Sequence, residues 1–120
     1  MKKILIVDDE PNIVMSLEYT FKKNNFEVFI ARDGQEALDI LKNQLPDLII
    51  LDVMMPMVDG YATLEQIKKD DRLQNCKVMF LSAKNKEKDI EKGLSLGANL
   101  YVVKPFSLKK LVEQVHDLLP

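Results

Sequence analysis

The sequence has few of the residues that covalent cross-links or soft-metal sites require. Its 120 residues include one cysteine, Cys76, one histidine, His116, and no tryptophan. A single cysteine excludes an internal disulfide and a metal site built from several thiolates. We therefore expect a reduced chain that is stabilised by an apolar core, in which Cys76 has no chemical role.

Long apolar runs and a strong excess of one charge are missing as well. No segment approaches the roughly 20 apolar residues of a transmembrane helix, and Asp8-Asp9-Glu10 interrupts the first apolar stretch too early for a signal peptide. The formal net charge is −2, and acidic residues lie between many of the lysine groups. This pattern favours solvated helix faces over a nucleic-acid-binding groove. We expect a cytoplasmic protein whose domain binds neither nucleic acid nor membrane.

What the sequence does contain is an alternation of short apolar runs with helical periodicity. The runs are rich in Val, Ile and Leu, which is typical of parallel strands buried on both faces. Pro11 suits the first turn of the first helix, Asp59 and Ser107 suit N-caps, and Gly97 suits a helix stop. The five expected strands cover residues 4–7, 27–31, 48–51, 78–82 and 100–104.

Five strands that alternate with five helices predict an α/β fold in one domain over residues 1–120. Right-handed crossovers between parallel strands place helices on both faces of the sheet. More than one strand order is possible; the flavodoxin-like order 2-1-3-4-5 is the expected one. The fourth helix is expected to carry Ile90 and Leu94 on its apolar side.

Four of the strands run directly into polar side chains: Asp8-Asp9, Asp52, Ser82 and Lys104. In an open parallel sheet, ligands bind beyond the carboxyl ends of the strands. In the expected strand order Asp8, Asp9 and Asp52 converge, and converging carboxylates repel one another unless a cation joins them. Mg²⁺ fits, since it binds one or two carboxylates together with waters and a phosphate. Lys104 and Ser82 would complete a phosphoryl pocket around a nucleophilic carboxylate.

Several of these residues, and Tyr101 in the fifth strand, also have a simpler interpretation. Asp52 suits a negative charge at the start of the next helix. Asp8-Asp9 suits a turn after a strand, Ser82 suits a cap, and Tyr101 suits half-buried packing in a strand. A cis Lys104–Pro105 bond, which would fix the position of the lysine, is left open.

Taken together, the motifs resemble the receiver domain of two-component response regulators over essentially the whole chain. The matching segments are Ile4-Leu5-Ile6-Val7-Asp8-Asp9-Glu10, Leu51-Asp52-Val53-Met54-Met55-Pro56 with Asp59-Gly60, Leu81-Ser82-Ala83, Gly97-Ala98 and Lys104-Pro105-Phe106.

The resemblance implies a role for each acidic residue. Asp52 would accept a phosphoryl group from a histidine of a partner kinase or phosphotransfer protein. Asp9 and Asp52 would bind Mg²⁺ directly, Asp8 would act through a water, and Met54 would offer its backbone carbonyl to the metal.

The resemblance also implies a conformational switch. Ser82 and Lys104 would hold the phosphoryl oxygens, and Tyr101 would turn inward when Ser82 moves. The face formed by the fourth helix, the fifth strand and the fifth helix would then signal to a downstream partner or output domain.

The chain departs from the subgroup that dimerises and binds DNA through a winged-helix domain. Asn99, Leu100 and Gln114 stand where that subgroup carries two acidic residues and an arginine. We therefore expect a monomer or a weak phosphorylation-dependent dimer. Because the chain stops at Pro120, we expect either a stand-alone receiver or one whose output domain has been removed.

Two other classes compete with the switch. A metal-dependent phosphohydrolase with an Asp nucleophile usually needs a second acid two residues later, where this chain has Met54. A flavodoxin-like cofactor module needs a Gly/Ser/Thr-rich loop for the FMN phosphate, but Asp8-Asp9-Glu10-Pro11 is acidic. We expect a switch that assists its own phosphorylation and autodephosphorylation, and no separate enzyme activity.

Overall fold

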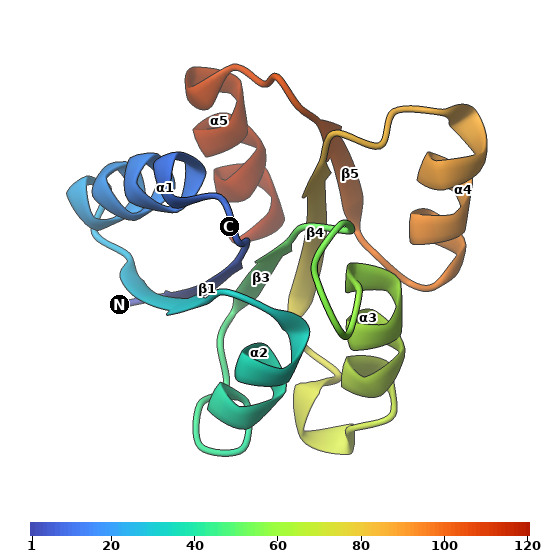
Figure 1. Ribbon diagram of the computed structural model, residues 1–120. Coiled ribbons are helices and arrows are strands. Elements are labelled where there is room, and N and C mark those ends of the chain that lie inside the picture. Colours follow the sequence, from blue (N-terminus) through green and yellow to red (C-terminus); the bar gives the residue numbers. More distant parts are fainter.

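The computed structural model describes residues 1–120 and contains one five-stranded sheet in the order β2-β1-β3-β4-β5 (Figure 1). All four neighbouring strand pairs are parallel. The predicted α/β fold with flavodoxin-like strand order is therefore confirmed. The strands are β1 (Lys3–Val7), β2 (Glu27–Ala31), β3 (Leu48–Leu51), β4 (Lys77–Ser82) and β5 (Leu100–Val103).

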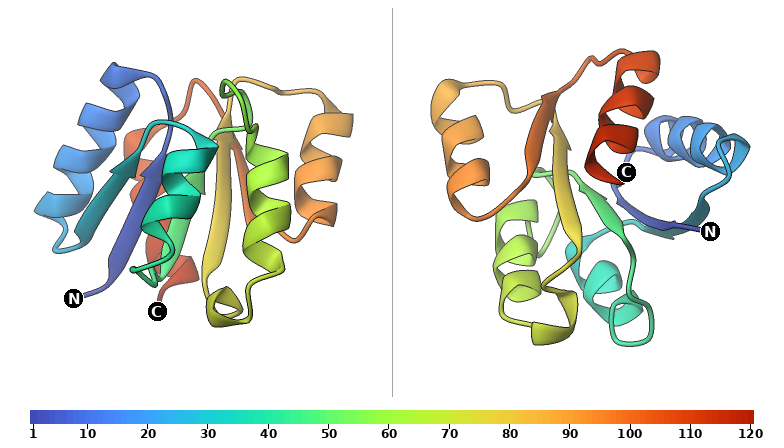
Figure 2. Two further views of the ribbon diagram at one scale, coloured as in Figure 1. Left: turned by 60° about the horizontal axis from the view of Figure 1, so that its bottom comes forward. Right: turned by 180° about the vertical axis from the view of Figure 1, so that it is seen from behind.

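Helices cover both faces of this sheet, as parallel strands with right-handed crossovers require. The helices α1 and α5 lie on one face, and α2, α3 and α4 lie on the other (Figure 2). None of the helices is both long enough and apolar enough to cross a bilayer. The helices are α1 (Pro11–Lys23), α2 (Gly34–Ile40), α3 (Gly60–Lys68), α4 (Glu87–Ser95) and α5 (Leu108–Leu118), with a short 3₁₀ helix η1 (Asp71–Leu73) after α3.

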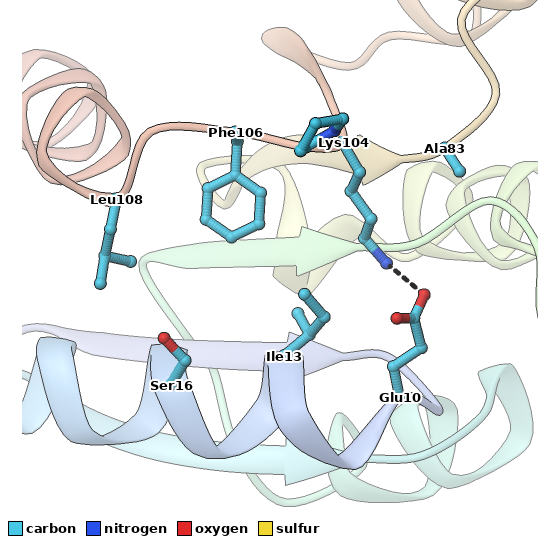
Figure 3. A pocket seen from close by; sticks show the side chains of 8 residues that line it. Glu10, Ile13, Ser16, Ala83, Lys104, Phe106 and Leu108 are labelled. Carbon is cyan, nitrogen blue, oxygen red and sulfur yellow. Dashed lines mark hydrogen bonds and ion pairs between the residues drawn. The ribbon is translucent and has the colours of Figure 1, made fainter.

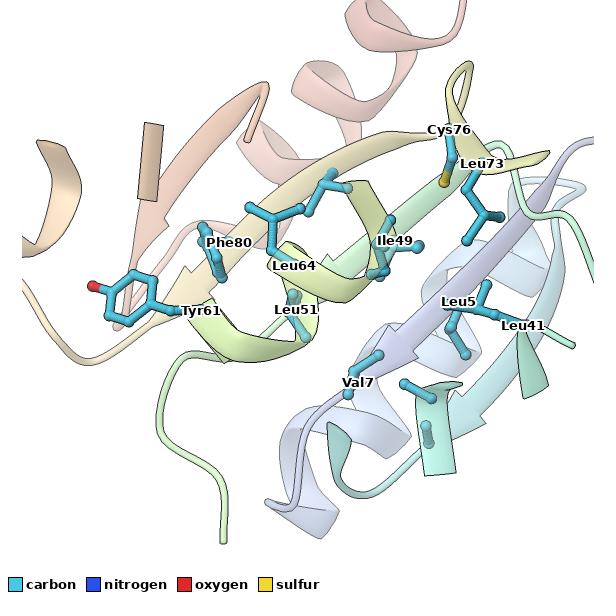
Figure 4. Packing of buried hydrophobic residues seen from close by; sticks show 14 of the residues in the cluster. Leu5, Val7, Leu41, Ile49, Leu51, Tyr61, Leu64, Leu73, Cys76 and Phe80 are labelled. Atoms are coloured by element: carbon cyan, nitrogen blue, oxygen red, sulfur yellow. The ribbon is translucent and has the colours of Figure 1, made fainter. Parts of the chain in front are cut away.

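The central strands are buried on both sides, which explains why their sequences are continuously apolar. In β1, Leu5 and Val7 point to the core beneath α2 and α3 (Figure 4), whereas Ile4 and Ile6 point to the core beneath α1 and α5. All four side chains have no exposed surface. Strands β3 and β4 alternate in the same way, so two cores share one sheet.

The helix ends follow the predicted signals. The Asp59 carboxylate accepts a hydrogen bond from the backbone N–H of Ala62 at 2.8 Å and caps α3. The Ser107 hydroxyl accepts one from the N–H of Lys110 at 3.3 Å and caps α5. Gly97, just beyond α4, has a φ of +109°, a left-handed conformation that favours glycine. These caps set where each helix starts or stops relative to the sheet.

The prediction for the apolar side of α4 was wrong at Leu94, which is 44 % exposed. Gly93 faces the sheet instead, and a Cβ built there would lie 2.9 Å from ring atoms of both Phe80 and Tyr101. The backbone of α4 thus rests directly on two aromatic rings, and this contact rotates Leu94 toward solvent. Periodicity does not reveal a glycine that serves as a contact surface.

Candidate functional site

The backbone hydrogen bonds of the sheet place the polar residues at its carboxyl edge. The N–H of Asp8 donates to the carbonyl of Ala31 at 3.1 Å, and the N–H of Asp52 donates to that of Val7 at 2.9 Å. The N–H of Lys104 likewise donates to the carbonyl of Ser82 at 2.8 Å. The hydrogen-bonding pattern of the sheet therefore continues one residue beyond three strands. It fixes the backbones of Asp8, Asp52 and Lys104 next to neighbouring strand ends.

The ammonium of Lys104 lies at the centre of this edge. Its Nζ is 2.9 Å from Oδ2 of Asp8, 3.1 Å from Oε1 of Glu10 and 3.7 Å from Oδ2 of Asp52. Figure 3 shows Lys104 reaching from the end of β5 to Glu10 at the start of α1. The side chains of Asp8, Asp52 and Lys104 are 3 %, 5 % and 9 % exposed. They form a desolvated charge cluster, in which removing Lys104 would leave buried carboxylates uncompensated.

The structure gathers a slightly different set of carboxylates from the predicted one. Asp8, Glu10 and Asp52 each offer an oxygen within 4.8 Å of the others, whereas Asp9 is exposed and lies outside this set. The cause is a tight turn in which the N–H of Glu10 donates to Oδ1 of Asp8 at 2.9 Å. Sequence reasoning missed Glu10, although it stands in the acidic run that carried the prediction.

Asp9 faces a separate hollow at the same edge of the sheet. This hollow of about 470 Å³ is also lined by Met54, Asp59 and Lys84. A second hollow of about 540 Å³ is lined by Glu10 and Lys104 together with residues of α1 and of the segment that follows β5. Asp9 and Glu10 thus open onto different hollows, although they are adjacent in sequence.

The environments of Asp52 and Lys104 perturb both pKa values upward. Burial raises the pKa of the Asp52 carboxyl, and the charge of Asp8 raises it further. Lys104, the N–H of Met54 and the Ser82 hydroxyl act in the opposite direction but do not cancel the rise. For Lys104, burial lowers the pKa, but Asp8, Asp52 and Glu10 outweigh it and leave the pKa raised. Lys104 is therefore a cation at neutral pH, and further positive charge nearby would stabilise the ionised form of Asp52.

Ser82 and Tyr101 meet at the backbone of Lys84. The fully buried Ser82 hydroxyl accepts a hydrogen bond from the N–H of Lys84 at 3.2 Å. The half-buried Tyr101 hydroxyl donates to the carbonyl of the same residue at 2.8 Å. The loop between β4 and α4 thus connects the hydroxyl at the site to the aromatic ring in β5. The Lys104–Pro105 peptide bond that follows β5 is cis, which settles the question that the sequence left open.

A second tyrosine, missed by sequence reasoning, belongs to the same assembly. Tyr61 of α3 is buried, and its ring centroid lies 5.5 Å from that of Phe80, which in turn lies 5.7 Å from that of Tyr101. Its hydroxyl donates to the carbonyl of Asp89 in the first turn of α4 at 2.9 Å. Tyr61 and Tyr101 therefore hold α4 and the loop before it from two different elements.

The structure places Cys76 in the core and Met54 beside Asp52 at the acidic edge. Cys76 is buried, and burial raises the pKa of its thiol to about 12, so it has no reactive thiolate at neutral pH. Met54 directs its N–H toward Oδ1 of Asp52 at 3.3 Å, while its side chain is 56 % exposed.

The donor set of this edge suits a hard cation. Three carboxylates offer only oxygen ligands, which Mg²⁺, Mn²⁺ and Ca²⁺ prefer over thiolates or imidazoles. The buried carboxylates, the lysine and the hydroxyl at the ends of successive strands define a flavodoxin-like α/β protein with an acidic site at its carboxyl edge.

Comparison with known proteins gives this class a family. The model of the response regulator receiver domain matches residues 4–116, and the chain belongs to this family of two-component signalling proteins. It is 41 % identical over 118 residues to the alkaline phosphatase synthesis transcriptional regulatory protein PhoP of Bacillus subtilis, covering 98 % of this chain and 48 % of that protein. It is 43 % identical over 118 residues to the probable transcriptional regulator ycf27 of Cyanophora paradoxa, with the same coverage. The chain thus spans about half the length of these relatives.

Solved structures agree with this assignment. The chemotaxis protein CheY4 of Vibrio cholerae superposes with a TM-score of 0.92 at 28 % identity, covering 98 % of both chains. The response regulator TrrA of Thermotoga maritima, in complex with Mg²⁺ and beryllium fluoride, superposes with a TM-score of 0.86 at 35 % identity, covering 98 % of this chain and 99 % of that one. These regulators give no support to the phosphohydrolase alternative.

Proposed function

We propose that this receiver domain accepts a phosphoryl group on Asp52 from a phosphohistidine of a kinase or phosphotransfer protein. The observation that carries the proposal is the buried Asp52 carboxylate, which lies 3.7 Å from the ammonium of Lys104 and close to Asp8 and Glu10. In the transfer, an oxygen of Asp52 attacks phosphorus and the bond from phosphorus to the histidine nitrogen breaks. The electron pair of that bond returns to the imidazole, and an acyl phosphate forms on Asp52.

The residues around Asp52 have complementary tasks in this step. Lys104 donates to a phosphoryl oxygen and offsets the charge that builds up on it, and the hydroxyl of Ser82 donates to another. The backbones of both residues are fixed at strand ends, so only their side chains have to move when the phosphoryl group arrives.

A divalent cation fits the acidic edge, and we propose Mg²⁺. Asp9, Asp52 and the backbone carbonyl of Met54 would bind it, with Asp8 acting through a water. When bound, Mg²⁺ supplies a positive charge beside the phosphoryl oxygens. The Mg²⁺ and beryllium fluoride complex of the Thermotoga relative supports this choice.

Phosphorylation adds close to two negative charges and three acceptor oxygens at Asp52. We propose that Ser82 moves toward these oxygens and that Tyr101 gives up its hydrogen bond to the Lys84 carbonyl and turns inward. The face formed by α4, β5 and α5 would then change. A downstream partner or an attached output domain would bind this face, while the cytoplasmic receiver stays a monomer or forms a weak dimer.

The test is intact mass after incubation with Mg²⁺ and acetyl phosphate. Wild type should gain one phosphoryl group and Asp52→Asn none, while Asp39→Asn, on the exposed side of α2, should react like wild type. Loss of the adduct over time in buffer would reveal autodephosphorylation. An unmodified wild type, or an adduct that persists in Asp52→Asn, would refute the assignment.

A further inference from the structure

We propose that Glu10 is a positioning residue that holds the ammonium of Lys104 away from Asp52 until a phosphoryl group arrives. The inference rests on the proposed function, because it concerns the step in which Lys104 changes partners. Glu10 offers a carboxylate oxygen 3.1 Å from Nζ of Lys104, which is closer than the nearest oxygen of Asp52 at 3.7 Å.

The resting position of the ammonium follows from the number of its donors. Lysine has three N–H donors on one nitrogen, and two of them bond to Asp8 and Glu10 at 2.9 and 3.1 Å. Asp52 is within ion-pair distance but receives no hydrogen bond from Lys104. These two acids, in the turn between β1 and α1, thus keep Lys104 on their side of the cluster and leave the attacking oxygens of Asp52 uncovered.

The two acids differ in how easily they can release the lysine. Asp8 is 3 % exposed, so breaking its ion pair would leave a buried carboxylate uncompensated. Glu10 is 56 % exposed, so water can solvate its carboxylate as soon as the bond opens. When phosphoryl oxygens form on Asp52, Glu10 is therefore the partner that Lys104 exchanges.

Glu10 also has a direct electrostatic effect on the modified state. Its carboxylate oxygen lies within 4.8 Å of an oxygen of Asp52, so its charge repels a dianionic phosphoryl group at that site. Both effects favour the unmodified domain. The contact between Glu10 and Lys104 exists only in the unmodified state, so it stabilises that state relative to the phosphorylated one.

Replacing the side chain of Glu10 should not disturb the start of α1. Glu10 stands at the N-cap of α1 but makes no capping hydrogen bond. Glu10→Gln keeps the length of the side chain and a neutral acceptor while it removes the charge. Glu18→Gln is the matched control, because Glu18 lies on the same helix and pairs with Lys22 at 2.9 Å on the surface.

The experiment measures the dissociation constant of beryllofluoride at saturating Mg²⁺ from the backbone amide signals of residues 82–84. Glu10→Gln should bind up to about fivefold more tightly than wild type, which corresponds to the upper end of the range for an exposed ion pair. Glu18→Gln should match wild type, and the melting temperatures of all three proteins should agree. In the free proteins, the side-chain ¹⁵N signal of Lys104 should shift in Glu10→Gln alone.

Equal or weaker beryllofluoride binding by Glu10→Gln would overturn the proposal. A parallel loss of Mg²⁺ affinity, measured without beryllofluoride, would also overturn it and would make Glu10 a metal ligand instead. If wild type bound no beryllofluoride at all, both the proposed function and this inference would fail. If wild type binds it but Glu10→Gln does not bind it more tightly, only the inference about Glu10 fails.

Discussion

At the scale of single residues, Asp52 combines a charge with an environment that disfavours it. Burial and the charge of Asp8 raise its pKa in the folded protein above the ordinary value of an aspartate side chain. A carboxyl group whose pKa is raised by folding destabilises the folded state at any pH where it is ionised. The same destabilisation makes the group a good acceptor of protons, cations and electrophiles.

We therefore expect Asp52→Asn to be more stable than wild type at pH 7 without divalent metal. Below the unfolded-state pKa, Asp52 is protonated in both states of the wild type and its penalty vanishes. The gain should therefore shrink as the pH falls through the folded-state pKa toward about 3.9. Urea unfolding in EDTA at several pH values measures this difference. A variant that is less stable than wild type at pH 7 would contradict the sign.

The sequence predicted which residues follow the strands but not where every side chain points. Asp52, Ser82 and Lys104 could be identified because each directly follows an apolar run whose end is set by the sheet. Asp9 and Glu10 lie in a turn, where the hydrogen bond from Glu10 to Asp8 decides which acid faces Lys104. No periodicity governs such a turn, so the two acids could not be distinguished from the sequence.

At the scale of secondary-structure elements, the start of α3 is packed against the backbone of the Asp52 residue. A Cβ at Gly60 would lie 2.2 Å from the carbonyl oxygen of Asp52. At Gly93 in α4, the nearest atoms are ring carbons of Phe80 and Tyr101 at 2.9 Å. Backbone atoms that are fixed by the sheet can move less than aromatic side chains to make room for an added methyl group.

Gly60→Ala should accordingly destabilise the protein more than Gly93→Ala does, by about 3 kcal/mol against about 1 to 2. Gly60→Ala should also slow phosphorylation by acetyl phosphate, because the displaced carbonyl belongs to Asp52, the proposed acceptor. Urea unfolding gives the stabilities, and intact mass against time gives the rates. The reverse order of stabilities would show that the backbone at Asp52 moves more easily than the aromatic rings.

The hydroxyl of Tyr61 bonds α3 to the first turn of α4 and should influence how readily that turn opens. Tyr61→Phe removes the donor to the Asp89 carbonyl and keeps the ring against Phe80. We expect a loss of about 1 kcal/mol and faster amide hydrogen exchange in α4 than in the other helices. Tyr19→Phe, at a position 68 % exposed, is the control. Uniform acceleration across all helices would mean that Tyr61 acts on global stability alone.

Element boundaries were predictable where local chemistry decides them and were missed where tertiary contacts do. Asp59 and Ser107 cap their own helices, so their roles could be predicted from the sequence. The 3₁₀ helix η1 has only three residues and too little periodicity to predict. Its Arg72 donates to the carbonyls of Leu41 and Lys42 beyond the end of α2, a contact across 30 residues of sequence that no local pattern reveals.

At the scale of the whole molecule, the acidic edge links cation binding to folding. The unfolded chain does not hold Asp52 next to Asp8 and Asp9, because Asp52 follows β3 whereas the other two follow β1. A cation that binds only the folded state stabilises it by an amount that grows with its concentration.

We expect Mg²⁺ at 100 times its dissociation constant to raise the free energy of unfolding by about 2.7 kcal/mol. In Asp52→Asn the increase should be much smaller, because one carboxylate is lost from the site. Thermal unfolding at constant ionic strength, with Na⁺ replacing Mg²⁺, separates binding from general screening. An equal increase in both proteins would place the cation elsewhere.

The bond between Lys104 and Asp8 joins residues 96 positions apart, which determines when the site forms during synthesis. On the ribosome, Asp8 and Asp52 emerge well before the lysine that balances them. A nascent chain that has not yet reached β5 would carry these carboxylates without their counter-charge and without the fifth strand that flanks β4. The growing polypeptide therefore completes its proposed acceptor site only after β5 has been synthesised and has joined the sheet.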